Sequence, residues 1–272
     1  MDSLSSAIDR LALSATTFFH GTLCGSSPFE GEPGPGHLHF VRSGRLTVHF
    51  DGHASVTIEQ PSLILLLPAR THRIETHGLA GAELVCAELH SEAGNSSVLP
   101  LGMPSPLVLT TADAPGLEAT LNTLFAEADC ERPGHRAATD RLVELLFILL
   151  LRHCLDNQSL QPGLLSGLAD PQLAKSLLAM HDAPGHAWTL DDLAGVAAMS
   201  RARFAANFKE RVGVPPGEYL TSLRITRAKT ELRLGKPLKL IATHVGYANS
   251  TALTRAFKQR TGSSPREWLA GQ

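Results

Sequence analysis

The alternation of apolar and polar residues predicts short strands over residues 37–110. "HLHFVRSGRLTVHFDG" (His37–Gly52) alternates between glycines, "SLILLLP" is a short apolar run that a proline ends, and "AELVCAELH" is a further strand candidate. Short strands separated by turn residues favour a small barrel or sandwich.

From Ala114 onward the apolar positions take helical spacing. Two helices are predicted, in "PGLEATLNTLFAEA" and "HRAATDRLVELLFILLLRHCLD", with "ERPG" between them. The second is apolar on almost every side between Leu145 and Leu151, which fits either a core helix packed against the barrel or a subunit interface. "DNQSLQPGLLSG" reads as a linker, and helices fill the rest. The predicted domains are 1–112, a helical connector with possible dimerisation helices at 113–162, and 163–272.

A repeat occupies the last third of the chain. "MSRARFAANFKERVGVPPGEYL" (Met199–Leu220) matches "ANSTALTRAFKQRTGSSPREWL" (Ala248–Leu269) at an offset of 49 residues. The matched pairs include Phe208 with Phe257, Lys209 with Lys258, Gly213 with Gly262, Pro216 with Pro265, and Glu218 with Glu267. Each copy predicts a helix-turn-helix unit, at about 190–212 and 239–262, whose second helix has Ser200 or Asn249 as its N-cap and ends at the glycine.

Charge divides the chain in the same way. Residues 187–272 contain 14 Lys and Arg against 6 Asp and Glu, whereas residues 1–186 contain 10 against 20. A basic last third on an acidic body indicates a module that binds a polyanion.

The second copy fits the pattern G-[FY]-x-[DN]-x-[ST]-x-[FL]-x-R-x-F-K. The matching residues are Gly246, Tyr247, Asn249, Thr251, Leu253, Arg255, Phe257 and Lys258. On these residues, the region from about Trp188 to Leu269 resembles the tandem helix-turn-helix domain of the AraC/XylS transcription regulators. The resemblance implies that the second helix of each unit enters the major groove of duplex DNA, in grooves one turn or about 34 Å apart. It also implies a homodimeric regulator, with activation more expected than repression, and RNA polymerase as a further partner.

A helical wheel separates two faces of the second unit's reading helix. Thr251, Thr254, Arg255 and Lys258 share one stripe, and Leu253, Ala256 and Phe257 lie opposite. Arg255 suits a guanine, Thr251 a base edge or thymine methyl, and Lys258 a phosphate. The alternative is an ordinary solvated amphipathic helix, which the repeat disfavours.

The first unit departs from this pattern. Its equivalent stripe consists of Ala202, Ala205, Ala206 and Lys209. Ala206 stands where the second unit has Arg255, and alanines contact thymine methyls without hydrogen-bonding to bases. Arg203 flanks the stripe, and Arg201 lies further round, nearer the phosphates. We therefore predict that the second unit supplies most base discrimination and that the first mainly positions the protein.

The segment that joins the two units, "TSLRITRAKTELR" (Thr221–Arg233), is strongly basic. Arg224 and Arg227 are three residues apart on one helical face. Either they contact phosphates or they belong to a solvated surface.

Two segments near the start resemble the sensor domains of the cupin type that many AraC-type regulators carry. They are "HFVRSG" (His39–Gly44) and "PSLILLLPARTHRI" (Pro61–Ile74). The usual Pro-Gly-Asp of the second segment is Pro61, Ser62 and Leu63 here, and the glutamate that completes many cupin metal sites is absent after His39. The resemblance implies an α+β multidomain fold: a cupin-like β-barrel, a helical connector and an all-α tandem helix-turn-helix domain.

Histidines are the candidate metal ligands of the front domain. His37, His39 and His72 are expected to gather on the barrel interior, with Cys86 as a candidate fourth ligand. These residue types suit Zn²⁺ or a similar divalent metal. The alternative is a set of hydrogen-bonded histidines without a metal.

Four further stretches resemble a branch of these regulators that responds to hypochlorous acid and related oxidants. They are "MDSLS", "LCGSSPF", "LVCAELH" and "PGHAWT". In this resemblance Cys24 and Cys86 match the redox-sensing cysteines, and an oxidised thiol can be captured by a second thiol as a disulfide. The alternative is that Cys86 is an inert buried cysteine. Cys130 and Cys154 are expected to pack.

Other features exclude some classes of protein. "MDSLSSAIDRLAL" lacks the basic start of a signal peptide, and "LVELLFILLL" is too short to span a bilayer. The four cysteines have no disulfide or zinc-ribbon spacing, so a cytoplasmic protein with no membrane partner is predicted. The main alternative is a regulator gated by a small-molecule or metal ligand in the cupin barrel. A metal-dependent cupin enzyme is less favoured, because an enzyme gains nothing from a duplicated recognition unit. A regulator gated by a small organic ligand stays open.

Overall fold

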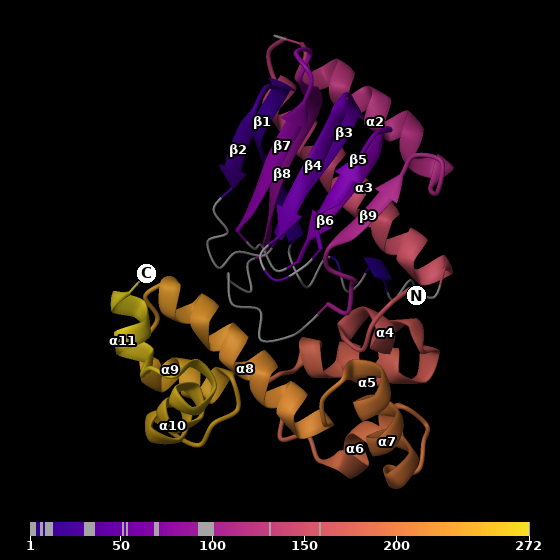
Figure 1. Cartoon of the computed structure of the whole chain (residues 1–272). Helices are drawn as coiled ribbons and strands as arrows, with labels where there is room; N and C mark the ends of the chain where they lie inside the picture. The colour runs from indigo at the N-terminus through magenta and orange to yellow at the C-terminus, as the bar shows by residue number, and fades with distance from the viewer. Residues whose placement is uncertain are drawn as a thin grey trace. The chain divides into compact units, whose positions relative to one another are not determined.

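The structure, a computed structural model, describes residues 4–5, 8, 13–29, 36–50, 52, 54–67, 71–91, 101–130, 132–157 and 159–271. The chain divides into two compact units. We call residues 13–91 and 103–159 the sheet unit, and residues 160–271 with Leu101 and Gly102 the helical unit. Each is described by itself, with the element labels of Figure 1.

The sheet unit is built from antiparallel strands in two sheets. The strands are β1 (Leu13–Leu23), β2 (Ser26–Phe29), β3 (Gly36–Ser43), β4 (Arg45–Phe50), β5 (Val56–Ile58), β6 (Ser62–Leu66), β7 (His72–His77), β8 (Ala82–Ser91) and β9 (Leu107–Thr110). One sheet has the order β1-β8-β3-β6-β9 and the other the order β2-β7-β4-β5. β1 and β2 lie before the region in which the sequence predicted strands, so that prediction was too short at its start.

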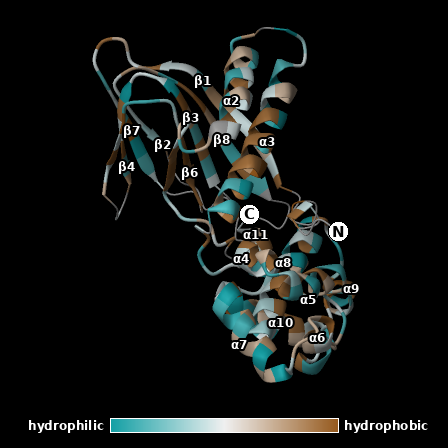
Figure 2. Ribbon diagram, turned by 90° about the vertical axis from the view of Figure 1, so that its right-hand side faces the viewer, coloured by the Kyte–Doolittle hydropathy of each residue, from teal (hydrophilic) through white to brown (hydrophobic). Residues whose placement is uncertain are grey.

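The core of this unit lies between the two sheets. In β4, Leu46, Val48 and Phe50 are buried and the residues between them are more exposed, as the period of two requires. They pack with Ile64 and Leu84 of the other sheet. Figure 2 shows the hydrophobic colouring of these strands.

Two helices, α2 (Pro115–Ala128) and α3 (His135–Asp156), complete the sheet unit. They have the bounds that the sequence predicted, and α3 packs against both α2 and β1. Since β1 is an edge strand, two of its amides find partners on α3: Thr17 N donates to Asp140 Oδ1 at 2.7 Å, and Ala15 N donates to Glu144 Oε1 at 3.3 Å. These carboxylates cover an edge that would otherwise leave its amides unpaired.

The helical unit contains short helices and one long one. They are α4 (Leu164–Ala169), α5 (Pro171–Asp182), α6 (Leu190–Val196), α7 (Arg201–Val212), α8 (Pro216–Arg233), α9 (Leu238–His244), α10 (Ser250–Thr261) and α11 (Pro265–Ala270). The predicted linker is wrong at its end, because Leu164–Gly167 belong to α4 and are buried. A side chain on Gly167 would meet Leu177 and Val212, so this glycine lets α4 pack closely on α5 and α7.

The two predicted helix-turn-helix units are α6–α7 and α9–α10. Ser200 and Asn249 are the N-caps of α7 and α10, as predicted, and accept from Arg203 N at 3.4 Å and Ala252 N at 2.9 Å. Gly213 and Gly262 end these helices with φ of 86° and 80°, values that favour glycine. The predicted order of antiparallel strands, helical pair and twin helix-turn-helix units is confirmed.

Candidate functional site

The outward face of α10 carries the side chains that the sequence analysis selected. Thr251, Arg255 and Lys258 are exposed and Thr254 is half-buried. On the opposite face Leu253 and Phe257 are fully buried in a core made with α8 and α9. Ala256 packs against that core and is itself only half-buried.

The first unit presents an equivalent face on α7. Ala202, Ala206 and Lys209 are exposed, Ala205 is half-buried, and Phe204 and Phe208 lie in the core. Arg203 is exposed beside this face. Arg201, also exposed, forms an ion pair with Asp191 at 3.2 Å.

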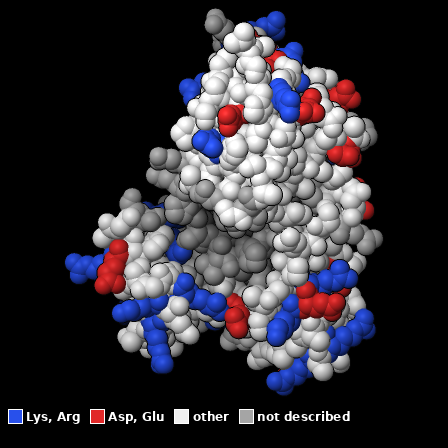
Figure 3. Space-filling model, viewed as in Figure 1, with Lys and Arg blue, Asp and Glu red and all other residues white. Residues whose placement is uncertain are grey.

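Several cations on these faces are free of protein partners. Within the described residues, the side chains of Arg203, Lys209 and Arg255 form no hydrogen bond or ion pair. Figure 3 shows Lys and Arg side chains gathered over α6–α7 and over α9–α10. Unpaired cations on a convex helix face are available to phosphates and to guanine edges.

The two arginines of the joining segment behave differently from each other. Arg227 is exposed and lies 3.6 Å from Glu231. Arg224 is half-buried and donates to two backbone carbonyls, so neither expectation for it, phosphate contact or solvated surface, describes its surroundings.

Inside the sheet unit, His37, His39 and His72 come together as predicted. One nitrogen from each lies within 4.8 Å of the others, and all three residues are buried. His37 and His39 come from β3 and His72 begins β7, so the cluster spans the two sheets. The shortest contact joins His39 Nε2 to His72 Nε2 at 2.7 Å.

Burial lowers the pKa of two of these three rings, His37 and His39. Burial is the main reason that the pKa of His39 lies well below its ordinary value of 6.5, and the charges of His72 and His37 lower it further. Burial also lowers the pKa of His37. A neutral imidazole is the form that binds a metal. His37 Nδ1 is buried and has no hydrogen-bond partner among the described residues.

Aromatic rings surround the cluster. The Phe29 ring stacks on His72 with centroids 5.2 Å apart and meets His39 edge-on at 5.1 Å. Phe18, next to the β-bulge of β1, lies 5.9 Å from His37. Glu88 of β8 pairs with His37 of β3 in the strand register and places Oε1 3.8 Å from His37 Nε2. The sequence analysis missed this carboxylate, because only the strand register brings it to His37.

Cys86 touches the cluster through His39. Its Sγ lies 3.1 Å from His39 Nδ1, the ring nitrogen that faces away from His72. When His39 carries its proton on Nδ1, it donates to Cys86, and its Nε2 lone pair faces His72 Nε2. Burial raises the pKa of the Cys86 thiol, and the residue is fully buried.

Cys24 does not lie beside Cys86. It follows Leu23, which pairs with Ala82, whereas Cys86 pairs with Phe19. A side chain on Gly81 would lie 2.8 Å from Cys24 Sγ, so the thiol sits near Gly81, five residues before Cys86. At about 3.3 Å per residue this is about 16 Å along the strand. A disulfide needs Cα atoms within about 6.8 Å, so the structure does not bring this pair together. Cys24 is exposed.

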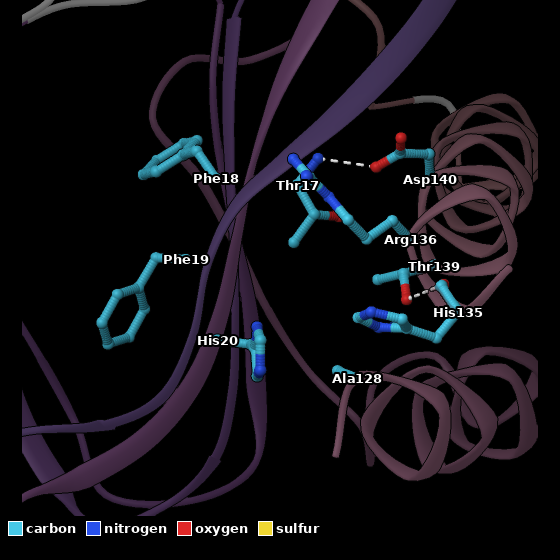
Figure 4. A pocket seen from close by; sticks show the side chains of 9 residues that line it. All are labelled: Thr17, Phe18, Phe19, His20, Ala128, His135, Arg136, Thr139 and Asp140. Carbon is cyan, nitrogen blue, oxygen red and sulfur yellow. Dashed lines mark hydrogen bonds between the residues drawn. The ribbon is translucent and has the colours of Figure 1, made fainter. Parts of the chain in front are cut away.

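A cavity of about 210 Å³ lies in the sheet unit, apart from the histidine cluster (Figure 4). Thr17 and His20 of β1 face His135, Arg136 and Asp140 of α3 across it. The contact of Asp140 with the backbone of Thr17 closes one side.

Comparisons with known proteins agree with both units. The family described as Cupin matches residues 2–156, and the family described as Helix-turn-helix domain matches residues 193–271. An AraC-like transcription regulator of Streptomyces antibioticus is 39% identical over 169 residues, which are 60% of this chain and 55% of that protein. The chain therefore spans little more than half the length of this relative.

A second relative covers more of the chain. The RCS-specific HTH-type transcriptional activator RclR of Escherichia coli is 30% identical over 215 residues, 77% of this chain and 75% of that protein. Among solved structures, ToxT of Vibrio cholerae aligns over 94% of this chain and 98% of its own, with a TM-score of 0.44 and 16% identity.

The chain contains an antiparallel sheet unit followed in the sequence by two helix-turn-helix units. This order places it in the class of helix-turn-helix regulators. The chain belongs to the AraC family of transcription regulators, with an N-terminal cupin domain and a C-terminal helix-turn-helix domain. The predicted family and fold class are confirmed. No helix among the described residues has both the length and the apolar character needed to cross a membrane.

Proposed function

We propose that the protein is a sequence-specific DNA-binding activator of transcription whose cupin domain receives the signal. The observation that supports DNA binding is the arrangement of α7 and α10. Each helix buries aromatic or aliphatic side chains on one face and presents exposed cations on the other. The name of the E. coli relative supports activation, and activation implies contact with RNA polymerase. Run-off transcription on a selected operator is the direct measurement, and reduced transcript on binding would contradict activation.

Within this function, α10 is the main reader and α7 mainly positions the protein. Arg255 is exposed and unpaired in the described part of the chain, so its guanidinium can reach a guanine edge. The outward side of α7 offers Ala202 and Ala206 in its middle, which cannot hydrogen-bond to bases. Thr251, Thr254 and Lys258 add contacts on α10, and Arg201, Arg203 and Lys209 add contacts on α7.

Arg255→Ala and Arg203→Ala separate these roles. Arg255→Ala is expected to cost about 1–3 kcal/mol on the selected operator and to relax preference at one base pair. Arg203→Ala is expected to weaken operator and scrambled DNA alike and to reduce the salt slope by about one. Titration against scrambled half-sites measures both effects, and a greater loss of sequence preference from Arg203→Ala would contradict the assignment.

For the signal, we propose a divalent cation of the Zn²⁺ type at His37, His39 and His72. Three facts support it: the nitrogens converge within 4.8 Å, burial lowers the pKa of His37 and His39, and His37 Nδ1 is a buried polar atom without a partner among the described residues. Imidazole nitrogens suit zinc. A bound cation would supply a fixed positive charge between the two sheets. Cys86 would act through His39 Nδ1, orienting the ring, rather than as a ligand.

Zinc titration tests this site. The wild-type protein is expected to take one Zn²⁺ per chain in competition with a chromogenic chelator, and His37→Gln to weaken that binding by at least about tenfold. His90→Gln, on the same sheet and partly exposed, is the matched control. Equal zinc affinity of the wild type and His37→Gln would overturn the proposal.

Oxidant sensing through Cys24 and Cys86 is a second candidate signal, which the resemblance to the oxidant-responsive branch and the E. coli relative favour. Because the strand register separates the two thiols, a direct disulfide would first require β1 and β8 to rearrange. Exposed Cys24 is therefore the proposed first target of the oxidant.

Thiol reactivity decides between the two cysteines. Cys24 is expected to be alkylated much faster than Cys86 in the native protein, since burial raises the pKa of Cys86 and removes the thiolate that reacts. Mass spectrometry of timed samples gives both rates. Cys24→Ser should lose the response of DNA binding to hypochlorous acid, with Cys130→Ser as control; an unchanged response would exclude Cys24.

We further propose that a second copy of the chain packs on α3. Leu142, Leu145 and Leu149 follow i, i+3, i+7 spacing on its outer side, and Leu145 is 42% exposed. The inner face of α3 is already used by Val143, Leu146, Phe147 and Leu150, so this stripe is a separate apolar surface.

Sedimentation velocity tests the dimer. Wild-type protein is expected to sediment as a dimer and Leu145→Arg as a monomer, because a charge in an apolar interface costs more than it does in water. Leu79→Arg, at a fully exposed leucine of the β7–β8 turn, is the control. A Leu145→Arg protein that stays dimeric would exclude this face.

A further inference from the structure

Arg224 occupies an unusual place in the helical unit. It projects from α8, the long helix that runs from the α6–α7 side to the α9–α10 side (Figure 1). Its Nε donates to Pro184 O and its Nη2 donates to His186 O, both at 2.8 Å. Its guanidinium also lies over the Tyr247 ring, 5.7 Å from the centroid. One side chain therefore touches the loop before the first helix-turn-helix unit and the turn of the second.

The loop that accepts these bonds is braced by its own contacts. Trp188 Nε1 donates to Ala183 O at 2.9 Å, and the His186 and Trp188 rings meet edge-on at 4.5 Å. His186 N also donates to Ala183 O at 3.1 Å. The two carbonyls are consequently held in place for Arg224, whose planar fork matches such paired acceptors.

Two glycines allow the loop and the turn to touch directly. A side chain on Gly185 would lie 2.3 Å from His244 O, and one on Gly246 would lie 2.6 Å from Gly185 O and 2.8 Å from Arg224 Nη2. Gly246 also has a φ of 79°, which favours glycine. The close approach explains why the stretch "PGH" (Pro184–His186) has a glycine at its centre. The proposed contacts with DNA do not involve this stretch.

We propose that Arg224, with Gly185 and Gly246, forms a clasp that fixes the two helix-turn-helix units relative to each other. The clasp thereby sets the spacing that the protein accepts between two DNA boxes, the short sequences that α7 and α10 each contact. The inference rests on the proposed reading of DNA by both α7 and α10. Arg224 is a positioning residue, because its Nε and Nη2 donate to protein carbonyls and its guanidinium lies over the Tyr247 ring. A rigid pair of reading helices accepts boxes at one helical phase only, and a loose pair tolerates others.

Arg224→Lys tests the clasp while keeping the charge. A lysine ammonium does not reproduce the planar fork that bridges Pro184 O and His186 O. Gly185→Ala tests it from the other side, since the added methyl pushes against the His244 backbone. The controls are Arg227→Lys, one turn along α8, and Gly195→Ala, whose methyl meets nothing within 4 Å.

The measurement is the ratio of affinities of the full chain for a selected two-box operator and for the same operator with one extra base pair between the boxes. We expect wild type and both controls to lose about tenfold or more from the insertion, comparable to a mismatched base pair. For Arg224→Lys and Gly185→Ala we expect a loss of about threefold or less, with a salt slope like that of wild type.

Two results would overturn the clasp. One is an unchanged spacing ratio in both variants. The other is an equal loss of affinity for both spacings in Arg224→Lys with a smaller salt slope, which would make Arg224 a phosphate contact. A wild-type protein that selects only a single box would instead contradict two-unit reading. Amide hydrogen exchange of His186 and Tyr247 then still tests the clasp, which requires faster exchange in Arg224→Lys than in Arg227→Lys.

Discussion

Contact between a buried phenylalanine of α7 or α10 and an aromatic ring of the helix that follows it is the interaction on which the helical unit depends. Phe208 meets Tyr219 edge-on at 5.5 Å, and Phe257 meets Trp268 at 5.8 Å. Both phenylalanines are fully buried. Because successive residues on a helix are about 100° apart, fixing one ring inward fixes the direction of every other side chain. The repeat in the sequence is thus a repeat of the ring pair, and it gives α7 and α10 the same orientation relative to their own cores.

The joining helix α8 carries the polar groups that such a small unit has to bury. Tyr219 Oη and His181 Nε2 lie 2.7 Å apart, and the Lys229 ammonium lies over the Trp268 ring. The Glu231 side chain is 5% exposed, with Arg227, Lys236 and His244 within 3.6 Å of its oxygens. A buried carboxylate without such partners would be costly. α8 therefore holds the units together by satisfied polar contacts as well as by apolar packing.

The sequence predicted what depends on local pattern. The bounds of α2 and α3, the caps at Ser200 and Asn249 and the faces of α10 all follow from spacing and capping chemistry. β1 was missed, because "LSATTFFHGTL" contains small polar residues and a bulge after Thr17 that interrupts its alternation. Contacts set by strand register or by backbone atoms leave no mark in the sequence. Strand register separates Cys24 from Cys86, and backbone carbonyls are the hydrogen-bond partners of Arg224.

The two helix-turn-helix units share the same core contacts but differ in the side chains on the outward faces of α7 and α10. Since matched ring pairs orient both helices in the same way, the two units differ mainly at the outward positions of these helices. Ala206 and Arg255 are equivalent positions in the repeat and both are exposed, yet only the arginine has donors for a base edge. On α7, Arg201 forms an ion pair with Asp191. Both side chains of this pair are more than 60% exposed. Such a pair is weak and gives way to a phosphate at little cost. The two helices thus have the same orientation relative to their own cores, and they differ in the chemistry of their outward side chains: three alanines on α7 stand where α10 has two threonines and Arg255.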